Sequence, residues 1–225
     1  MPFLPSLLEY NTAALDQKIK LISKYETQIL KIQQSEIIIL HLDFVGPEFA
    51  ANRGVQPSLQ PEDVFPLITQ YFDQHRIDLS IHFMATDNDM DNTIDYLIPV
   101  FSELAFDQEW SGKVFVTKEQ TKMLDFLPEI SNFELGEWLD LGEWSNWQLE
   151  SKKNYLLMTV LAGKSGQKMT PEDQQKAMEL AKNNPDSHIT LDGGWNLENE
   201  LYDNLDIVSY SSFWKRVEEI LTKVE

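Results

Sequence analysis

Two histidines and two aspartates stand where apolar runs of this sequence end. His41 and Asp43 close the run 37–44, His82 lies in the run 77–84, and Asp192 follows the run 189–191. Because one residue separates His41 from Asp43, both side chains point to the same side of a strand. Imidazole nitrogens and carboxylate oxygens together form a ligand set suited to Zn²⁺, Mn²⁺ or Fe²⁺. Strands that end at one edge would bring His41, Asp43, His82 and Asp192 together as a site for one divalent metal ion.

One histidine at the end of a strand, taken alone, is more often a hydrogen-bonded structural residue than a ligand. Finding four polar residues at matching strand ends favours a site. The other two histidines, His75 and His188, lie near the starts of strands, and we expect them to be structural.

Two glycine-rich segments in the last third of the chain indicate anion binding. Residues 158–168 read Met-Thr-Val-Leu-Ala-Gly-Lys-Ser-Gly-Gln-Lys, and residues 189–194 read Ile-Thr-Leu-Asp-Gly-Gly. In each, a β-type run ends in glycines, where the backbone approaches a ligand closely and turns its N–H groups towards an anion. Two such loops in consecutive strand–helix units predict a phosphate clamp, and Asp192 on the second loop predicts that the chemistry lies nearby.

The charge of the chain limits the classes of ligand. A formal net charge of −19 argues against nucleic-acid binding, which needs a basic face. It also argues against long-range attraction of an anionic substrate. Any phosphate must therefore be held by local backbone amides and a few cations, of which Lys164 and Lys168 are nearest.

The composition predicts one globular domain over residues 1–225. The chain is 42% hydrophobic and 11% aromatic, which excludes a disordered polypeptide. It has no cysteine, so disulfides, thiolate ligands and cysteine nucleophiles are excluded. The apolar stretches are too short to span a bilayer, and the first residues lack the features of a signal peptide. We expect a cytoplasmic protein without a membrane partner.

Strand-like and helix-like runs alternate along the chain. We expect strands at 3–8, 37–44, 77–84, 113–117, 135–144, 155–161, 189–191 and 206–210. We expect helices at 12–24, 61–74, 91–104, 120–133, 145–153, 171–183, 197–204 and 213–224, and Pro128 should bend or end the helix at 120–133. Eight alternating pairs predict a single parallel (β/α)₈ TIM barrel. A doubly wound open sheet is the alternative, which the absence of G-x-G-x-x-G after the first strand weakens as a dinucleotide-binding domain.

Five motifs follow one another in a characteristic order. They are Pro5-Ser6-Leu7-Leu8, His41-Leu42-Asp43, His82-Phe83-Met84, the segment 158–167, and Asp192-Gly193-Gly194 with Asn196 and Glu198-Asn199 behind it. In type, order and spacing they resemble the ribulose-phosphate 3-epimerase family of TIM barrels. That family carries Pro-Ser-Ile-Leu, His-x-Asp, His-Leu-Met, Met-Ser-Val-x-Pro-Gly-x-Gly-Gly-Gln and Asp-Gly-Gly-x-Asn-x-Glu-Asn.

The resemblance implies a metal-dependent 3-epimerase of a ketose phosphate. In the family, the residues matching His41, Asp43, His82 and Asp192 bind one divalent metal, and those matching Asp43 and Asp192 are the two catalytic acid/bases. Epimerisation next to a ketone removes a C–H proton and returns one on the other face, through an enediolate that the metal stabilises. The substrate would be ribulose 5-phosphate or a relative such as a hexulose 6-phosphate, which would place the protein in pentose phosphate metabolism.

The resemblance also implies the residues that surround the substrate. Ser6 would contact it, and Met84 and Met158 would cover its reacting carbons with apolar surface. The residues expected around the phosphate are Gly163, Ser165, Gly166, Gly193, Gly194 and Ser211. We also expect a homo-oligomer, in which tryptophans such as Trp138 and Trp214 could pack an interface or the core.

The chain departs from the family pattern at several positions. After His41-Leu42-Asp43, Val45 replaces a methionine and Gly46 an acid, and after the last strand Tyr210-Ser211 replaces Gly-Ser. In the phosphate loop, Leu161-Ala162 replaces x-Pro and Ser165 replaces glycine. Backbone N–H groups survive these changes. The changes nevertheless leave two alternatives open, a catalytically silent or regulatory sugar-phosphate-binding barrel and a related phosphate-binding barrel that acts as a decarboxylase or isomerase.

Overall fold

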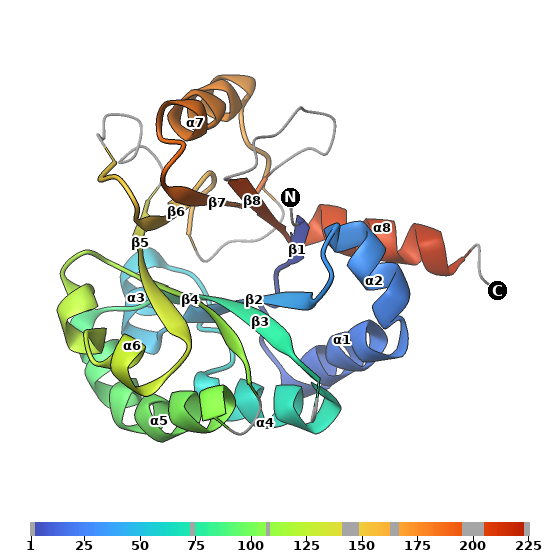
Figure 1. Ribbon diagram of the computed structural model, residues 1–225, viewed down its shortest axis with the longest axis horizontal. Coiled ribbons are helices and arrows are strands. Elements are labelled where there is room, and N and C mark those ends of the chain that lie inside the picture. Colours follow the sequence, from blue (N-terminus) through green and yellow to red (C-terminus); the bar gives the residue numbers. More distant parts are fainter. Residues whose placement is uncertain are drawn as a thin grey trace.

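The computed structural model describes residues 3–72, 75–106, 109–140, 149–162, 167–194 and 205–222. Within them, eight parallel strands form one nearly closed barrel surrounded by helices (Figure 1), which confirms the (β/α)₈ prediction. The strands are β1 (Phe3–Pro5), β2 (Ile38–Val45), β3 (Ile77–Met84), β4 (Ser111–Val116), β5 (Phe133–Leu139), β6 (Asn154–Met158), β7 (His188–Asp192) and β8 (Leu205–Ser209).

The sheet runs in the order β1-β8-β7-β6-β5-β4-β3-β2. The seam between its two ends is closed by a parallel bridge of Ser6 with His41 and by the Leu7 amide, which donates to the His41 carbonyl at 2.8 Å. β1 and β2 are therefore neighbours, and the carboxyl ends of all eight strands meet at one mouth.

Helices cover the outside of this barrel (Figure 1). They are α1 (Thr12–Lys24), α2 (Glu26–Gln33), α3 (Pro47–Arg53), α4 (Pro61–Phe72), α5 (Asp87–Phe106), the 3₁₀ helix η1 (Gln120–Leu124), α6 (Leu127–Ile130), α7 (Pro171–Asn183) and α8 (Ser211–Leu221). No helix among these described segments is both long and apolar enough to cross a membrane.

Side chains of the strands alternate between two apolar layers. In β2, Leu40, Leu42 and Phe44 pack outwards against the helices. The intervening positions His41, Asp43 and Val45 face the barrel interior, where Val45 joins a second cluster with Met84 and Met158. Both faces of β2 and β3 are almost entirely buried, as expected for parallel strands covered by helices. The inner cluster lies at the mouth and forms the apolar surroundings of the polar strand ends.

Several predicted boundaries need correction in the middle of the chain. The single helix expected at 120–133 is wrong: the chain forms η1 and then α6, with Pro128 in the first turn of α6, and Phe133 already begins β5. A proline in a first turn starts a helix because its missing N–H would have no partner there. The strand expected at 135–144 is therefore shifted to Phe133–Leu139. Of the helix expected at 145–153, the described residues include a turn at 151–152 instead.

Two helices were missed and one expected helix is not described. α2 follows α1 after the single residue Tyr25, and α3 has only seven residues. The start of α3 is bound by the side chain of Asp89, about 40 residues away, which no local pattern reveals. The helix expected at 197–204 lies outside the described residues.

Candidate metal and substrate site

Three strands place the four candidate ligands side by side at the mouth of the barrel. The register pairs Asp43 of β2 with His82 of β3, and Asp192 is the last residue of β7. Each of the four side chains offers one ligand atom, and these atoms all lie within 4.8 Å of one another. All four residues are buried. The predicted convergence of His41, Asp43, His82 and Asp192 is therefore present in the structure.

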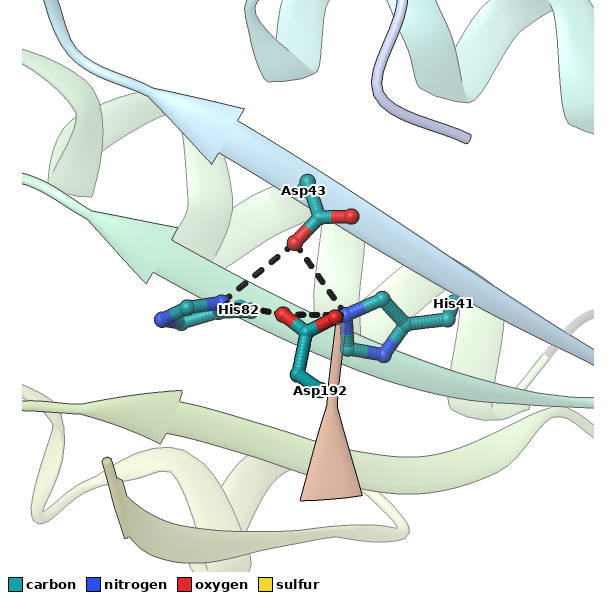
Figure 2. A group of neighbouring side chains, drawn as sticks. All are labelled: His41, Asp43, His82 and Asp192. Carbon is teal, nitrogen blue, oxygen red and sulfur yellow. Dashed lines mark hydrogen bonds and ion pairs between the residues drawn. The ribbon is translucent and has the colours of Figure 1, made fainter. Parts of the chain in front are cut away.

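The two histidines turn different ring nitrogens towards the acids (Figure 2). His41 Nε2 lies 3.2 Å from Asp43 Oδ1 and 3.8 Å from Asp192 Oδ2. His82 instead uses Nδ1, which lies 3.3 Å from Asp43 Oδ1 and 3.4 Å from Asp192 Oδ2. Each carboxyl group thus directs one oxygen atom to both imidazoles, and this shared point is where the ligand atoms converge.

Two serine hydroxyls fix the orientation of this group. Ser6 donates to Asp43 Oδ2 at 2.7 Å, which leaves Oδ1 for the imidazoles. On the far side of His41, Nδ1 lies 2.8 Å from the hydroxyl of Ser80. A ligand histidine is commonly held in this way through its second nitrogen. Ser80 was missed by the sequence analysis, although it lies two residues before His82 and so on the same face of β3.

The pKa values of the two carboxyl groups are shifted in opposite directions. Burial opposes the charge on Asp43, but the attraction and hydrogen bonds of His41 and His82 outweigh it and lower the Asp43 pKa. Burial raises the pKa of Asp192, and repulsion from Asp43 raises it further against the pull of the same histidines. Burial likewise opposes the charge on His82, but hydrogen bonds to Asp192 and Asp43 raise its pKa. Acids with pKa values moved in opposite directions can divide the roles of proton acceptor and proton donor.

The donor set fits a divalent cation. Two carboxylates and two imidazoles, all on buried residues, form a ligand set suited to Zn²⁺, Mn²⁺ or Fe²⁺. Two buried acids that repel each other also gain from a positive charge between them. The residues predicted as metal ligands therefore have the chemistry and proximity that such an ion requires.

A cavity of about 490 Å³ opens above Asp43 and Asp192. Met84, Met158 and Leu8 line it with apolar surface, and Ser6 adds a hydroxyl. His41 and His82 do not line the cavity. They lie behind Asp43, which does line it and which both imidazoles contact. Ser6, Met84 and Met158, predicted to touch a substrate, are thus brought together around the two acids.

Beyond the acids, the cavity is lined by the second glycine segment and the start of α8. Gly193, Gly194 and Ser211, all predicted phosphate ligands, line it together with Ser212. The other three predicted phosphate residues, Gly163, Ser165 and Gly166, lie outside the described residues. Lys168, expected to be near the phosphate, also lines the cavity, and Lys164 lies outside the described residues. Lining residues that the sequence analysis did not assign to the site include Gln167, Gln174, Ser209 and Tyr210.

The backbone conformation at positions 193 and 194 requires glycine. Both have positive φ angles, 94° and 63°. A Cβ atom on Gly193 would lie 2.3 Å from a methyl carbon of Val160, and one on Gly194 would lie 2.4 Å from the Met169 amide nitrogen. Side chains are excluded on both counts, so the backbone itself lines the cavity.

The two histidines expected to be structural lie at the other end of the barrel. His188 begins β7, and its Nε2 lies 2.5 Å from Asp206 near the start of β8. His75 precedes β3, and its carbonyl accepts a hydrogen bond from Trp110 Nε1 at 2.7 Å.

Comparison with known proteins agrees with this geometry. The family model described as ribulose-phosphate 3 epimerase family matches residues 5–204, which include all four candidate ligands. The chain belongs to the ribulose-phosphate 3-epimerase family. No curated protein matches the chain significantly. The family is one of metal-dependent epimerases that bind sugar phosphates, and the buried His41, Asp43, His82 and Asp192 group could hold the metal.

Proposed function

We propose that this protein is an active metal-dependent 3-epimerase of a ketose phosphate such as ribulose 5-phosphate. The observation that carries the proposal is the placement of Asp43 and Asp192, which meet the same two imidazoles from β2 and β7 and both line the cavity. A substrate carbon lying between them would have one carboxyl group available to each of its faces.

The two acids would exchange protons with C3 of the substrate. One carboxylate removes the C–H proton from one face, and the other carboxyl group delivers a proton to the opposite face. The opposite pKa directions of Asp43 and Asp192 support this division, because one group favours the ionised form and the other the protonated form. A divalent cation held by His41, Asp43, His82 and Asp192 would supply positive charge beside the negative charge that develops on the substrate oxygens.

The rest of the cavity would position the substrate. Met84 and Met158 present apolar surface beside the acids, which keeps water from the reacting carbons. The backbone at Gly194, Ser211 and the amino end of α8 would receive the phosphate through N–H groups, whereas the Gly193 amide donates to the Val208 carbonyl. Local donors of this kind are needed because the net charge of −19 does not attract anions.

Asp192→Asn and Asp43→Asn test the two-acid mechanism. Each variant keeps the shape of the side chain but removes a basic oxygen, so turnover should fall by roughly two to four orders of magnitude. The measurement is deuterium uptake at C3 of ribulose 5-phosphate and of a hexulose 6-phosphate, made together with the metal content of each variant.

Asp206→Asn is the matched control. Asp206 is also a buried acid next to a histidine, but it lies near the start of β8, at the far end of the barrel. Its variant should keep the wild-type rate of exchange. If Asp192→Asn retains its metal and exchanges the C3 proton at the wild-type rate, the two-acid mechanism is wrong.

A further inference from the structure

We propose that Trp138 is a positioning residue whose indole ring holds the imidazole of His82 with Nδ1 facing Asp43 and Asp192. This inference rests on the proposed function, because it assigns a role next to one ligand of the proposed metal site. It concerns a residue of β5, a strand that contributes none of the four candidate ligands.

The two ligand histidines differ in what holds their second nitrogen. His41 Nδ1 has the Ser80 hydroxyl at 2.8 Å. His82 Nε2 is buried and has no hydrogen-bond partner in the described part of the chain. A ligand histidine without an oxygen acceptor on its second nitrogen needs another restraint on its ring orientation.

Trp138 supplies a contact that can act as this restraint. Its ring centroid lies 5.0 Å from that of His82, and the two planes meet at 66°, an edge-to-face arrangement. Trp138 is only 6% exposed, and Phe49 of α3 packs edge-on against it at 6.2 Å. The indole is therefore itself held by a second aromatic ring, and an aromatic π face can accept an N–H group weakly where no oxygen is present.

The contact matters for coordination because a neutral imidazole carries one proton. If His82 Nδ1 is to bind a cation, that proton must reside on Nε2, which is the buried nitrogen without a partner. Rotation of the ring by half a turn would replace Nδ1 with a carbon atom and remove the ligand. The indole opposes this rotation by occupying the space beside the ring.

Trp138 contacts His82 and also lines a second cavity, whose lining does not include His82. This cavity of about 410 Å³ is lined by Trp138 together with Phe49, Arg53, Thr117 and Asp140, on the β2–β5 side of the mouth. Loss of the indole would open a path for water to His82 Nε2. A water acceptor would leave the ring free to adopt other orientations.

The test compares Trp138→Met and Trp138→Phe with the wild type in Co²⁺ titration, followed by the visible absorption of the bound ion. Methionine fills much of the volume without a π face, and we expect its Co²⁺ affinity to fall about 10- to 100-fold, with a changed spectrum. Phenylalanine restores an aromatic face and should remain within about threefold of the wild type. Trp110→Met is the control, since Trp110 is buried at the opposite end of the barrel, and it should leave affinity and spectrum unchanged.

A second measurement needs no variant. In the Zn²⁺-loaded wild type, the His82 Nε2–H proton, which has no oxygen acceptor, should resonate upfield of the His41 Nδ1–H proton, which is shifted downfield by its bond to Ser80. Unchanged Co²⁺ affinity and spectrum in folded Trp138→Met, or a downfield, solvent-exchanging His82 proton, overturns the inference while the metal site stands. A wild type that binds no metal overturns the proposed function and this inference with it.

Discussion

At the scale of single residues, the site depends on which atom each side chain presents. His41 offers Nε2 and His82 offers Nδ1, and the two aspartates each turn one oxygen towards both rings. These choices are made by neighbours that are not themselves candidate ligands, namely Ser6 on Asp43 and Ser80 on His41. Substitution of these neighbouring serines should therefore change the affinity of the site for metal.

Ser80→Ala should weaken metal binding without unfolding the protein. The variant removes the hydroxyl 2.8 Å from His41 Nδ1, so the imidazole loses the contact that sets its tautomer and orientation. We expect metal affinity to fall about 10- to 100-fold, as measured by competition with a chelator. Ser187→Ala is the control, since Ser187 is equally buried but donates to the Glu150 carbonyl near the start of β7. Equal metal affinity of Ser80→Ala and the wild type would show that Ser80 does not orient His41.

At the scale of elements, the loops at the mouth are held by contacts between distant segments. The carboxylate of Asp89, in the first turn of α5, accepts the amides of Glu48 and Phe49 at the start of α3, each at 3.0 Å. It therefore caps a helix that is far from it in sequence, and it fixes Phe49, which packs on Trp138. Burial opposes the charge on Asp89, but hydrogen bonds from Glu48, Thr86 and Phe49 outweigh it and lower its pKa.

Asp89→Asn should destabilise the protein in a pH-dependent way. A carboxyl group whose pKa is lowered on folding stabilises the folded protein at pH values above its unfolded pKa of about 3.9. This stabilisation is lost as the pH falls through the pKa of the group in the folded protein. At pH 7 we expect a loss of about 1–2 kcal/mol in the free energy of unfolding by urea, because an amide has one acceptor oxygen for N–H groups that now bond to both carboxylate oxygens. The difference from the wild type should shrink below about pH 4. Asp63→Asn, which removes an acid with one exposed 3.3 Å hydrogen bond, should show much less effect at pH 7.

Gly194→Ala should damage the loop after β7 more than its backbone angle alone predicts. Gly54 is a matched control, because it has nearly the same φ angle, 64° against 63°, but no atom within 4 Å of an added Cβ. Gly54→Ala should cost about 1 kcal/mol from left-handed backbone alone. Gly194→Ala adds a clash with the Met169 amide and should also weaken inorganic phosphate binding, measured by calorimetry. Equal stability and phosphate affinity in the two variants would exclude a special role for Gly194.

At the scale of the whole molecule, the candidate ligands lie on both sides of the barrel seam. His41 and Asp43 belong to β2, whereas Asp192 belongs to β7, and β1 and β8 lie between these strands in the closed order. The three-residue β1 meets β2 through the bridge of Ser6 with His41. A cation bound by β2, β3 and β7 would thus connect segments across the shortest strand of the barrel.

Metal binding should therefore stabilise the complete barrel. At a free metal concentration 100 times Kd, the expected gain is about 2.7 kcal/mol. For a chain of this size this corresponds to an increase in Tm of roughly 5–10 °C. Thermal unfolding with and without Zn²⁺ or Mn²⁺ measures the effect, and His82→Ala should lose most of it. A wild-type Tm that does not depend on metal would contradict a site that spans these strands.

The sequence alone determined the order of the strands and the residues at their ends. Apolar runs separated by helical patterns predict eight parallel strands, because backbone hydrogen bonding imposes its period within each segment. The same period places His41 and Asp43 on one face, and glycine spacing marks the loop at Gly193 and Gly194, where positive φ angles exclude other residues. These properties are local, so they can be predicted from the sequence without knowledge of the fold.

Only the tertiary structure decided how those residues act on one another. The nitrogen that each histidine presents depends on Ser80 and, as we propose, on Trp138, which are its neighbours only through the register of adjacent strands and the packing inside the barrel. The start of α3 likewise depends on Asp89, about 40 residues away. The opposite pKa directions of Asp43 and Asp192 arise from burial and from charges on other strands. Such effects follow from distances across the closed barrel, and the spacing of residues along the chain does not contain them.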